Sequence, residues 1–277
     1  MNPRFREKIL SKVSAIESNL RELKILMSSN DITMSTPQHP PKTKLQTEDL
    51  GKKFERAICY ALDISYVGKY KYDEEWAKEF AKSRLGELHR LFPPSCTHTA
   101  KNGERYDYTY TYGEVTRHLS AKSVKLSKRK NAKNAKSKVA PQVIGQPSIE
   151  KFATYIGCDQ TESSVRDKVI TDPQCILKLM EDYTFDSEIL YYNEKTNKIC
   201  YIRKHTDIDW MKYSLSFTQD WRTSGKNSTN IKLHYQDKDV SIVEIQKHSK
   251  GRQNMAIRWY FDDILEIFKD NFDIHYL

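Results

Sequence analysis

The sequence predicts a mixed α/β fold, in which helices flank a central mixed β-sheet and a helical arm precedes it. Helical patterns occupy the first part of the chain, strand patterns fill the middle, and more helical patterns surround them. Ten Phe, seventeen Tyr and four Trp in 277 residues are enough for a buried core. No apolar run approaches the roughly 18 residues of a membrane span, and the start lacks a secretory apolar segment. We therefore expect a cytoplasmic protein.

The N-terminal region predicts an amphipathic helix over residues 1–28, because apolar residues recur there at spacings of three and four. Residues 29–47 contain "STPQHPPKTK", a polar, proline-rich stretch that is typical of a linker. The main domain is expected to cover residues 48–277.

Helices of the main domain are predicted from apolar periodicity and capping residues. Thr47 can cap a helix whose apolar face is formed by Leu50, Phe54, Ile58 and Leu62. A second helix is expected from about Asp73 to Leu91, ending at "FPPS", and one or two more in "PQVIGQPSIEKFATYIG". The segment "FDDILEIFKDNF" predicts a helix that closes the chain.

Strands are predicted where Tyr, Thr, Val and Ile alternate with polar residues. "RYDYTYTYGEVTRHLSAKSVKL" predicts a hairpin that turns at Gly113 and whose second strand ends near Lys122. Later strands are expected at "SEILYYNE", "KICYIRK", "NIKLHYQ", "VSIVEIQK" and "AIRWYF", with a turn around Thr196 and Asn197.

Positive charge is concentrated in one part of the chain. The formal net charge is +9, and the window from Val115 to Ile149 holds nine Lys and Arg but no Asp or Glu. Such a window favours binding to a polyanion, because neutralised phosphates release counterions. The other composition signals are negative: five cysteines without a CxxC pair predict reduced thiols, and no HExxH, Walker or GxGxxG motif is present.

Asp107 and Lys122 are expected on neighbouring strands of the predicted hairpin. A carboxylate there can hold Mg²⁺, which prefers oxygen ligands. A nearby lysine can orient or deprotonate an attacking water and offset charge on a phosphate. Phosphodiester hydrolysis needs these parts. The alternative is an ordinary surface pair in a hairpin.

These motifs resemble the PD-(D/E)xK nuclease superfamily, the fold of many type II restriction endonucleases. The resemblance rests on Tyr106-Asp107, on Ser120-Ala121-Lys122, on Glu55 in "GKKFE" and on "KVAPQVIGQ", and it spans roughly residues 48–265. It implies a restriction-endonuclease-like fold and Mg²⁺-dependent, site-specific hydrolysis of double-stranded DNA. It also leaves a homodimer open.

The resemblance implies a role for each matching residue. Asp107 would hold the metal, Lys122 would act on the water and the scissile phosphate, and Glu55 would assist at the metal. Two residues depart from the family pattern: Tyr106 replaces its proline, and Ser120 replaces its second acid. The missing ligand is then expected from Glu55, Glu114 or Gln142.

A competing catalytic constellation lies later in the chain. In "HYQDKDVSIVEIQKHS", Asp237 or Asp239 precedes Glu244-x-Gln246, which resembles an ExQ form of the same motif. We favour the first site because it supplies the lysine and adjoins the basic window.

Candidate DNA-binding residues form two groups. Those expected to grip the phosphate backbone are Lys125, Lys128, Arg129 and Lys130. Those with donors and acceptors suited to base edges are Gln246, His248, Arg252, Gln253 and Asn254. Two other functions stay open: a non-catalytic nucleic-acid-binding protein, and a junction or repair nuclease of the same superfamily.

Overall fold

The computed structural model describes residues 47–68, 73–100, 104–126, 136–248 and 254–277. All of them belong to one compact unit, Leu45–Leu277. The arm and linker predicted for residues 1–46, and the side chain of Thr47 with its capping role, lie outside the described part. No helix among the described residues is long and apolar enough to cross a membrane.

A six-stranded mixed sheet lies at the centre of the described unit, in the order β1-β2-β3-β5-β6-β11. Its strands are β1 (Thr97–His98), β2 (Tyr108–Tyr112), β3 (Val115–Val124), β5 (Glu188–Asn193), β6 (Lys198–Lys204) and β11 (Phe272–Tyr276). The β3–β5 pair is parallel, and the other four pairs are antiparallel. The predicted mixed α/β architecture with a central mixed sheet is therefore confirmed.

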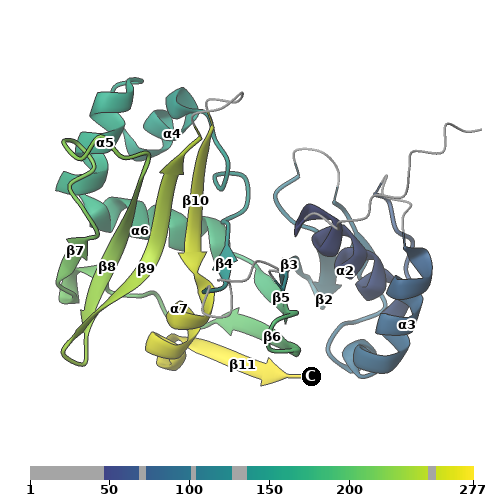
Figure 1. The fold of residues 1–277 in the computed structure, drawn as a ribbon. Helices are drawn as coiled ribbons and strands as arrows, with labels where there is room; N and C mark the ends of the chain where they lie inside the picture. Colours follow the sequence, from purple (N-terminus) through teal and green to yellow (C-terminus); the bar gives the residue numbers. More distant parts are fainter. Residues whose placement is uncertain (1–46, 69–72, 101–103, 127–135, 249–253) are drawn as a thin grey trace, which may run out of the picture. The chain divides into compact units, whose positions relative to one another are not determined.

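Both faces of this sheet are covered. Helices α2 (Thr47–Ala61) and α3 (Glu74–Arg84) pack on one face, where Leu190 and Tyr192 of β5 point (Figure 1). Ile189 and Tyr191 point to the other face and a second core. Every residue of β5 is consequently buried, as expected for a strand between two layers.

A second, five-stranded sheet was not anticipated from the sequence. It is antiparallel throughout, in the order β4-β10-β9-β8-β7. Its strands are β4 (Lys138–Val139), β7 (Leu215–Phe217), β8 (Ser228–Tyr235), β9 (Lys238–Lys247) and β10 (Met255–Tyr260). The predicted strands from residue 228 onward are confirmed as strands, but they belong to this separate sheet.

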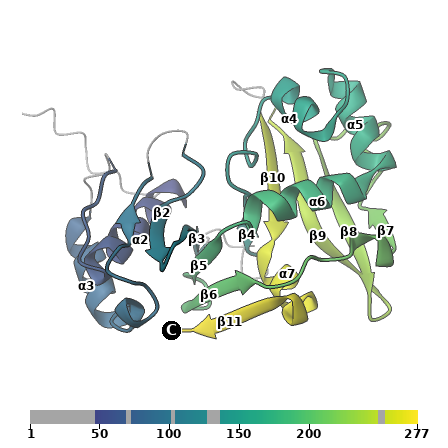
Figure 2. The same ribbon diagram turned by 180° about the vertical axis from the view of Figure 1, so that it is seen from behind.

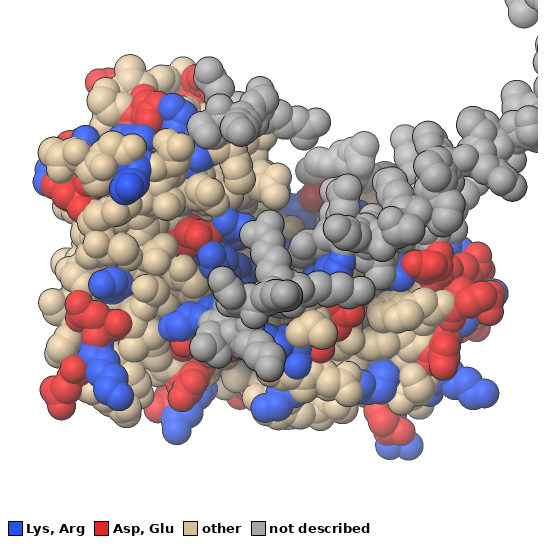
Figure 3. Space-filling view, in the orientation of Figure 1, with Lys and Arg blue, Asp and Glu red and all other residues tan. Residues whose placement is uncertain are grey.

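Three helices and a short C-terminal helix surround the second core. They are α4 (Ile149–Ile156), α5 (Glu162–Thr171), α6 (Pro173–Thr184) and α7 (Phe261–Ile267). Helix α6 crosses one face of the second sheet (Figure 2) and buries Ile176, Leu177 and Met180. In the described chain no helix lies across the opposite face of β8–β10, which is turned to the viewer in Figures 1 and 3.

Two predicted helix ends were wrong. The helix expected to reach Leu91 ends at Arg84, and only a short 3₁₀ turn, Leu88–Arg90, follows. Gly86, a poor helix residue, lies at this break. The chain does not close with a helix either: α7 ends at Ile267, another 3₁₀ turn covers Lys269–Asn271, and the edge strand β11 pairs with β6.

Candidate active site

The β2–β3 hairpin brings Asp107 and Ser120 side by side. Gly113 turns the chain with a φ of +61°, a left-handed conformation that glycine adopts without strain. Tyr108 pairs with Leu119, so Asp107, directly before β2, lies beside Ser120. The Ala121 N–H donates a hydrogen bond of 2.8 Å to Asp107 Oδ2. The backbone thus fixes the carboxylate against the strand that carries Lys122.

Lys122 is a buried lysine without a partner among the described residues. It alternates on β3 with Leu119 and Ala121, which pack toward α2, so Lys122 and Ser120 share the opposite side of the strand. Only 9% of Lys122 is exposed. Its amine forms no ion pair or hydrogen bond within the described chain, although a buried cation is costly unless it is paired.

Glu55 reaches this region from helix α2. It is 6% exposed and pairs with Lys52 Nζ at 2.9 Å, one helical turn earlier. The Tyr108 hydroxyl donates a 2.6 Å hydrogen bond to the backbone carbonyl of Glu55. This bond ties the helix to β2 and fixes the position of Glu55 relative to Asp107.

His98 is a site residue that the sequence did not indicate. Its Nδ1 accepts the backbone N–H of Val67 at 3.0 Å, which places the proton of the neutral ring on Nε2. Nε2 lies 3.7 Å from Glu55 Oε2 and is buried without a hydrogen-bond partner in the described chain. No spacing in the sequence links residues 55 and 98, which meet only in the fold.

Gln142 joins the site through a strained turn. Its side-chain amide lies 3.3 Å from both Asp107 Oδ2 and Ser120 Oγ. The next residue, Val143, has a φ of +60°, which is rare for a β-branched residue and is often found near functional sites. A side chain at Gly145 would meet the backbone carbonyl of Pro141 at 2.7 Å, so glycine is required to close this turn.

The pKa values of Asp107 and Lys122 are shifted in opposite directions. Loss of water, followed by repulsion from Glu55, raises the pKa of Asp107 from 3.8 to about 6. Burial lowers the pKa of Lys122 from 10.5 to about 8, against the attraction of Asp107 and Glu55. Each charge acts on the other, so the two groups lie within electrostatic reach. Opposite shifts within one cluster are a common property of active sites.

The donor set is compatible with a hard divalent cation. Glu55 and Asp107 supply carboxylate oxygens, and their mutual repulsion would be relieved by a cation between them. In the described part of the chain no group of three or more His, Cys, Asp or Glu is arranged to hold a metal. A site with two carboxylates suits Mg²⁺, which usually keeps several waters.

Glu114, one of the predicted substitutes for the missing acid, does not reach the site. It is exposed in the hairpin turn beside Gly113, at the opposite end of the strands from Asp107. The hydroxyl of Ser120 instead contacts Ser187 Oγ at 3.0 Å, in addition to Gln142. The position of the second acid is thus occupied by a neutral, hydrogen-bonded group.

The competing constellation is not assembled as a site. Asp239 lies opposite His234 at the hairpin end of β9, whereas Glu244 lies opposite Asn230, five residues and about 16 Å further along the strand. Asp237 is in the hairpin turn. Glu244 is held by Lys138 at 2.7 Å and by Arg258, and Gln246 accepts a bond from Arg258 at 2.9 Å.

The structure describes four of the nine DNA-binding candidates. Lys125 is half-buried directly after β3, Gln246 is half-buried on β9, His248 is exposed after that strand, and Asn254 is half-buried before β10. Lys128, Arg129, Lys130, Arg252 and Gln253 lie outside the described residues.

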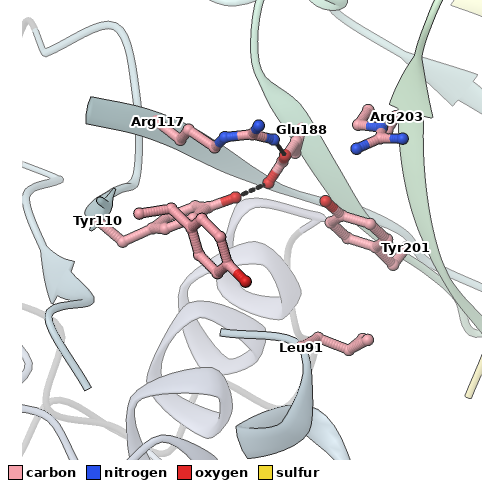
Figure 4. Close-up of a pocket in the computed structure, with 7 residues that line it drawn as sticks. Leu91, Tyr110, Arg117, Glu188, Tyr201 and Arg203 are labelled. Carbon is pink, nitrogen blue, oxygen red and sulfur yellow. Dashed lines mark hydrogen bonds and ion pairs between the residues drawn. The ribbon is translucent and has the colours of Figure 1, made fainter. Parts of the chain in front are cut away.

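None of the predicted site residues lines the cavity of about 310 Å³ shown in Figure 4. Glu188 projects into it and accepts hydrogen bonds from Tyr110 Oη and from Arg117, the latter at 3.1 Å. Its buried carboxylate is therefore compensated, unlike the cluster around Asp107.

A comparison with known proteins finds a relative that is similar to most of this chain. The chain is 35% identical over 233 residues to the type II restriction enzyme CviAII of Paramecium bursaria Chlorella virus 1. The chain is similar to a restriction enzyme. The similarity covers 83% of this chain and 63% of the relative, so the chain spans less than two thirds of that protein's length. This similarity confirms the expected likeness to type II restriction enzymes. No family model and no solved structure matches the chain.

Proposed function

We propose that this chain is a type II restriction endonuclease that hydrolyses phosphodiester bonds of double-stranded DNA at a specific short sequence, with Mg²⁺. The observation that carries the proposal is the buried amine of Lys122, which has no partner within the described chain and lies in electrostatic reach of Asp107 and Glu55. The similarity to a restriction enzyme along most of the chain supports the same activity.

Asp107 and Glu55 are the residues that would hold Mg²⁺. When bound, the cation polarises a phosphate oxygen and lowers the pKa of water, which makes hydroxide available at neutral pH. Asp107 is prepared for this role because Ala121 and Gln142 both approach Oδ2, so that neither donor uses Oδ1. His98 directs Nε2 toward Glu55 Oε2 and would keep that carboxylate oriented.

Lys122 would act at the attacking water and the scissile phosphate. With a pKa of about 8, a fraction of the amine is neutral near pH 7 and can accept the proton of the water. In its charged form the same group offsets the negative charge that develops on the phosphate. A low-dielectric setting strengthens that second effect.

Ser120 and Gln142 would complete the site as neutral groups. Their hydrogen bond of 3.3 Å links the β3 strand to the turn after β4. We assign them the orientation of Asp107 and of water, and no anionic ligand role. Lys125 and the basic residues 128–130 would grip the DNA backbone. A cytoplasmic location and a homodimer stay predictions.

Digestion of a circular plasmid of known sequence tests the proposal. With Mg²⁺ the wild-type chain should produce discrete fragments whose ends share one sequence, and EDTA should stop the reaction. Cutting only at four-way junctions would indicate a junction or repair nuclease. Retained DNA binding without any cleavage, in all divalent metals tried, would indicate a non-catalytic DNA-binding protein.

A further inference from the structure

The face of the second sheet that no described helix covers carries a group of polar side chains. On β9 and β10 the residues Val243, Ile245, Ile257 and Trp259 point into the core. The alternate residues therefore point to the other face. We call this group the open-face cluster; its members are Lys138, Asn230, Lys232, Glu244, Gln246 and Arg258.

Arg258 is held in place by two acceptors of this cluster. It lies directly opposite Glu244 across the β9–β10 pair and forms an ion pair with it. It also donates a hydrogen bond of 2.9 Å to Oε1 of Gln246, which lies two residues after Glu244 on β9. Its side chain is still 32% exposed. A guanidinium fixed in this way loses less side-chain entropy on binding, and part of it stays open to a ligand.

The cluster carries three cations and one carboxylate, so its net charge is positive. Glu244 is 13% exposed and lies between Lys138 and Arg258, which prevents it from repelling an anionic partner as a bare carboxylate would. Figure 3 shows Lys and Arg side chains on this face of the molecule, with acidic side chains among them. This balance suits a partner that presents both phosphates and polar base edges.

The open-face cluster is continuous with the proposed active site along the chain. Lys138 begins β4, and Gln142, which contacts Asp107, follows four residues later. Lys138 lies over the Tyr260 ring at 5.3 Å and bonds Glu244 at 2.7 Å. One short segment therefore links the polar sheet face to the carboxylate cluster.

We infer that the open-face cluster reads the base sequence of duplex DNA, with Arg258 contacting a guanine edge and Asn230 an adenine edge. This inference rests on the proposed function, since it names how that function chooses its substrate. Arg donates two hydrogen bonds to guanine O6 and N7, and Asn pairs with adenine N6 and N7, so both residue types discriminate bases. Strands are known to enter DNA grooves in other sheet proteins.

A solvated polar face with a structural ion pair is the competing explanation, because one face of an antiparallel sheet is often exposed. The two explanations differ in one variant. Arg258→Lys keeps the charge and the ion pair but removes the planar fork that discriminates guanine. Arg203→Lys is the matched control, because Arg203 lies opposite Asp273 on β6–β11 and bonds it at 2.8 Å, far along the chain from the cluster.

The experiment selects duplexes with a randomised central window, in Mg²⁺, using the full-length chain with Lys122→Ala so that bound DNA is not consumed. The parent should enrich one motif. Arg258→Lys should lose preference at a G·C pair by about ten- to hundredfold and keep the rest of the motif. Non-specific affinity should stay unchanged because the charge is kept. Arg203→Lys should select the parental motif, and Asn230→Ala should relax an A·T position.

An identical motif for the parent, Arg258→Lys and Asn230→Ala would overturn the inference, as would a parent that enriches no motif. Cleavage by the chain with Lys122 restored is measured separately. If the chain with Lys122 restored cuts no DNA while Arg258→Lys still alters the selected motif, the proposed nuclease function fails and the base-reading role stands. If it cuts at its motif regardless of residue 258, the base-reading role fails and the nuclease stands.

Discussion

Asp107 and Glu244 are two carboxylates in opposite electrostatic situations. Glu244 lies between Lys138 and Arg258 and has its charge compensated by two direct ion pairs. Asp107 receives hydrogen bonds from neutral donors, faces repulsion from Glu55 and has its pKa raised to about 6. The lysine near it, Lys122, is buried and forms no direct ion pair with any described residue.

Glu244 thus forms direct ion pairs with described residues, whereas Asp107 forms none within the described chain. The charges around Glu244 lie in direct ion pairs with one another. The uncompensated charges around Asp107 cost stability, and folds retain such costs mainly where a ligand or substrate supplies the missing partner. Both carboxylates were candidates from sequence alone. Their surroundings in the fold favour Asp107 as the metal-binding carboxylate of the proposed site.

A very large effect on cleavage is expected from removing the charge of Asp107. Asp107→Asn keeps the shape of the side chain but removes the principal anionic ligand, so we expect Mg²⁺-dependent cleavage to fall by about 10³-fold or more. Titration of Mg²⁺ against the cleavage rate checks this. Near wild-type cleavage by the variant would show that another group holds the metal.

Stability should change in opposite directions at the two carboxylates. The folded-state pKa of Asp107 is raised, so its contribution is most favourable below pH 4 and is lost as the pH rises through about 6. In metal-free buffer at pH 7.5, Asp107→Asn should therefore be more stable than wild type by roughly 1–3 kcal/mol, and this gain should vanish near pH 4. Urea unfolding at both pH values measures it.

Glu244→Gln is the matched variant for that comparison. It leaves Lys138 and Arg258 without their carboxylate, so we expect a loss of roughly 1–2 kcal/mol at pH 7.5, because removing one partner leaves the other charges uncompensated. Mg²⁺ should stabilise the wild type and Glu244→Gln but not Asp107→Asn. Equal stabilisation of Glu244→Gln and Asp107→Asn by Mg²⁺ would contradict the proposed difference between the two regions.

The geometry of the candidate site could be predicted from the sequence because its main elements are local. Alternation and Gly113 define the β2–β3 hairpin, which alone places Asp107 next to Ser120 and Lys122. The periodicity of α2 placed Glu55 on a helix ahead of the sheet. These features depend on residues close together in the chain, where turn and periodicity rules apply.

The unpredicted parts depend on long-range contacts. His98 meets Glu55, and Ser187 meets Ser120, across long stretches of the chain. Strand spacing did not reveal that β8–β10 form their own sheet, because the same alternation suits either sheet. Helices α5 and α6 were overlooked in a polar stretch, although Asp172 caps α6 and Pro173 occupies its first turn.

A smaller effect is expected from the basic window. Neutralising Lys128, Arg129 and Lys130 together should weaken binding to all DNA sequences alike. The slope of log affinity against log salt should decrease by about one unit for each phosphate that is no longer neutralised. Binding measured at several salt concentrations on specific and scrambled duplexes checks this. A change in the preferred sequence would mean that these residues read bases.

The smallest effect is expected at Ser120. Ser120→Ala removes a neutral hydroxyl that bonds Ser187 and Gln142, and a water can take its place. Cleavage should fall only a few-fold, far less than in Asp107→Asn. Single-turnover rates of the two variants under the same conditions make the comparison. A Ser120→Ala chain as inactive as Asp107→Asn would give the hydroxyl a direct role.

Side-by-side cleavage by Lys122→Ala and Glu244→Ala tests most directly which of the two regions is catalytic. Lys122→Ala should abolish cleavage while DNA binding stays within a few-fold, because one lysine among many contributes little to affinity but acts in the transition state. Glu244→Ala should still cut DNA in Mg²⁺, although less stable. Near wild-type cleavage by Lys122→Ala, together with an inactive but folded Glu244→Ala, would contradict the account and move the active site to the second sheet.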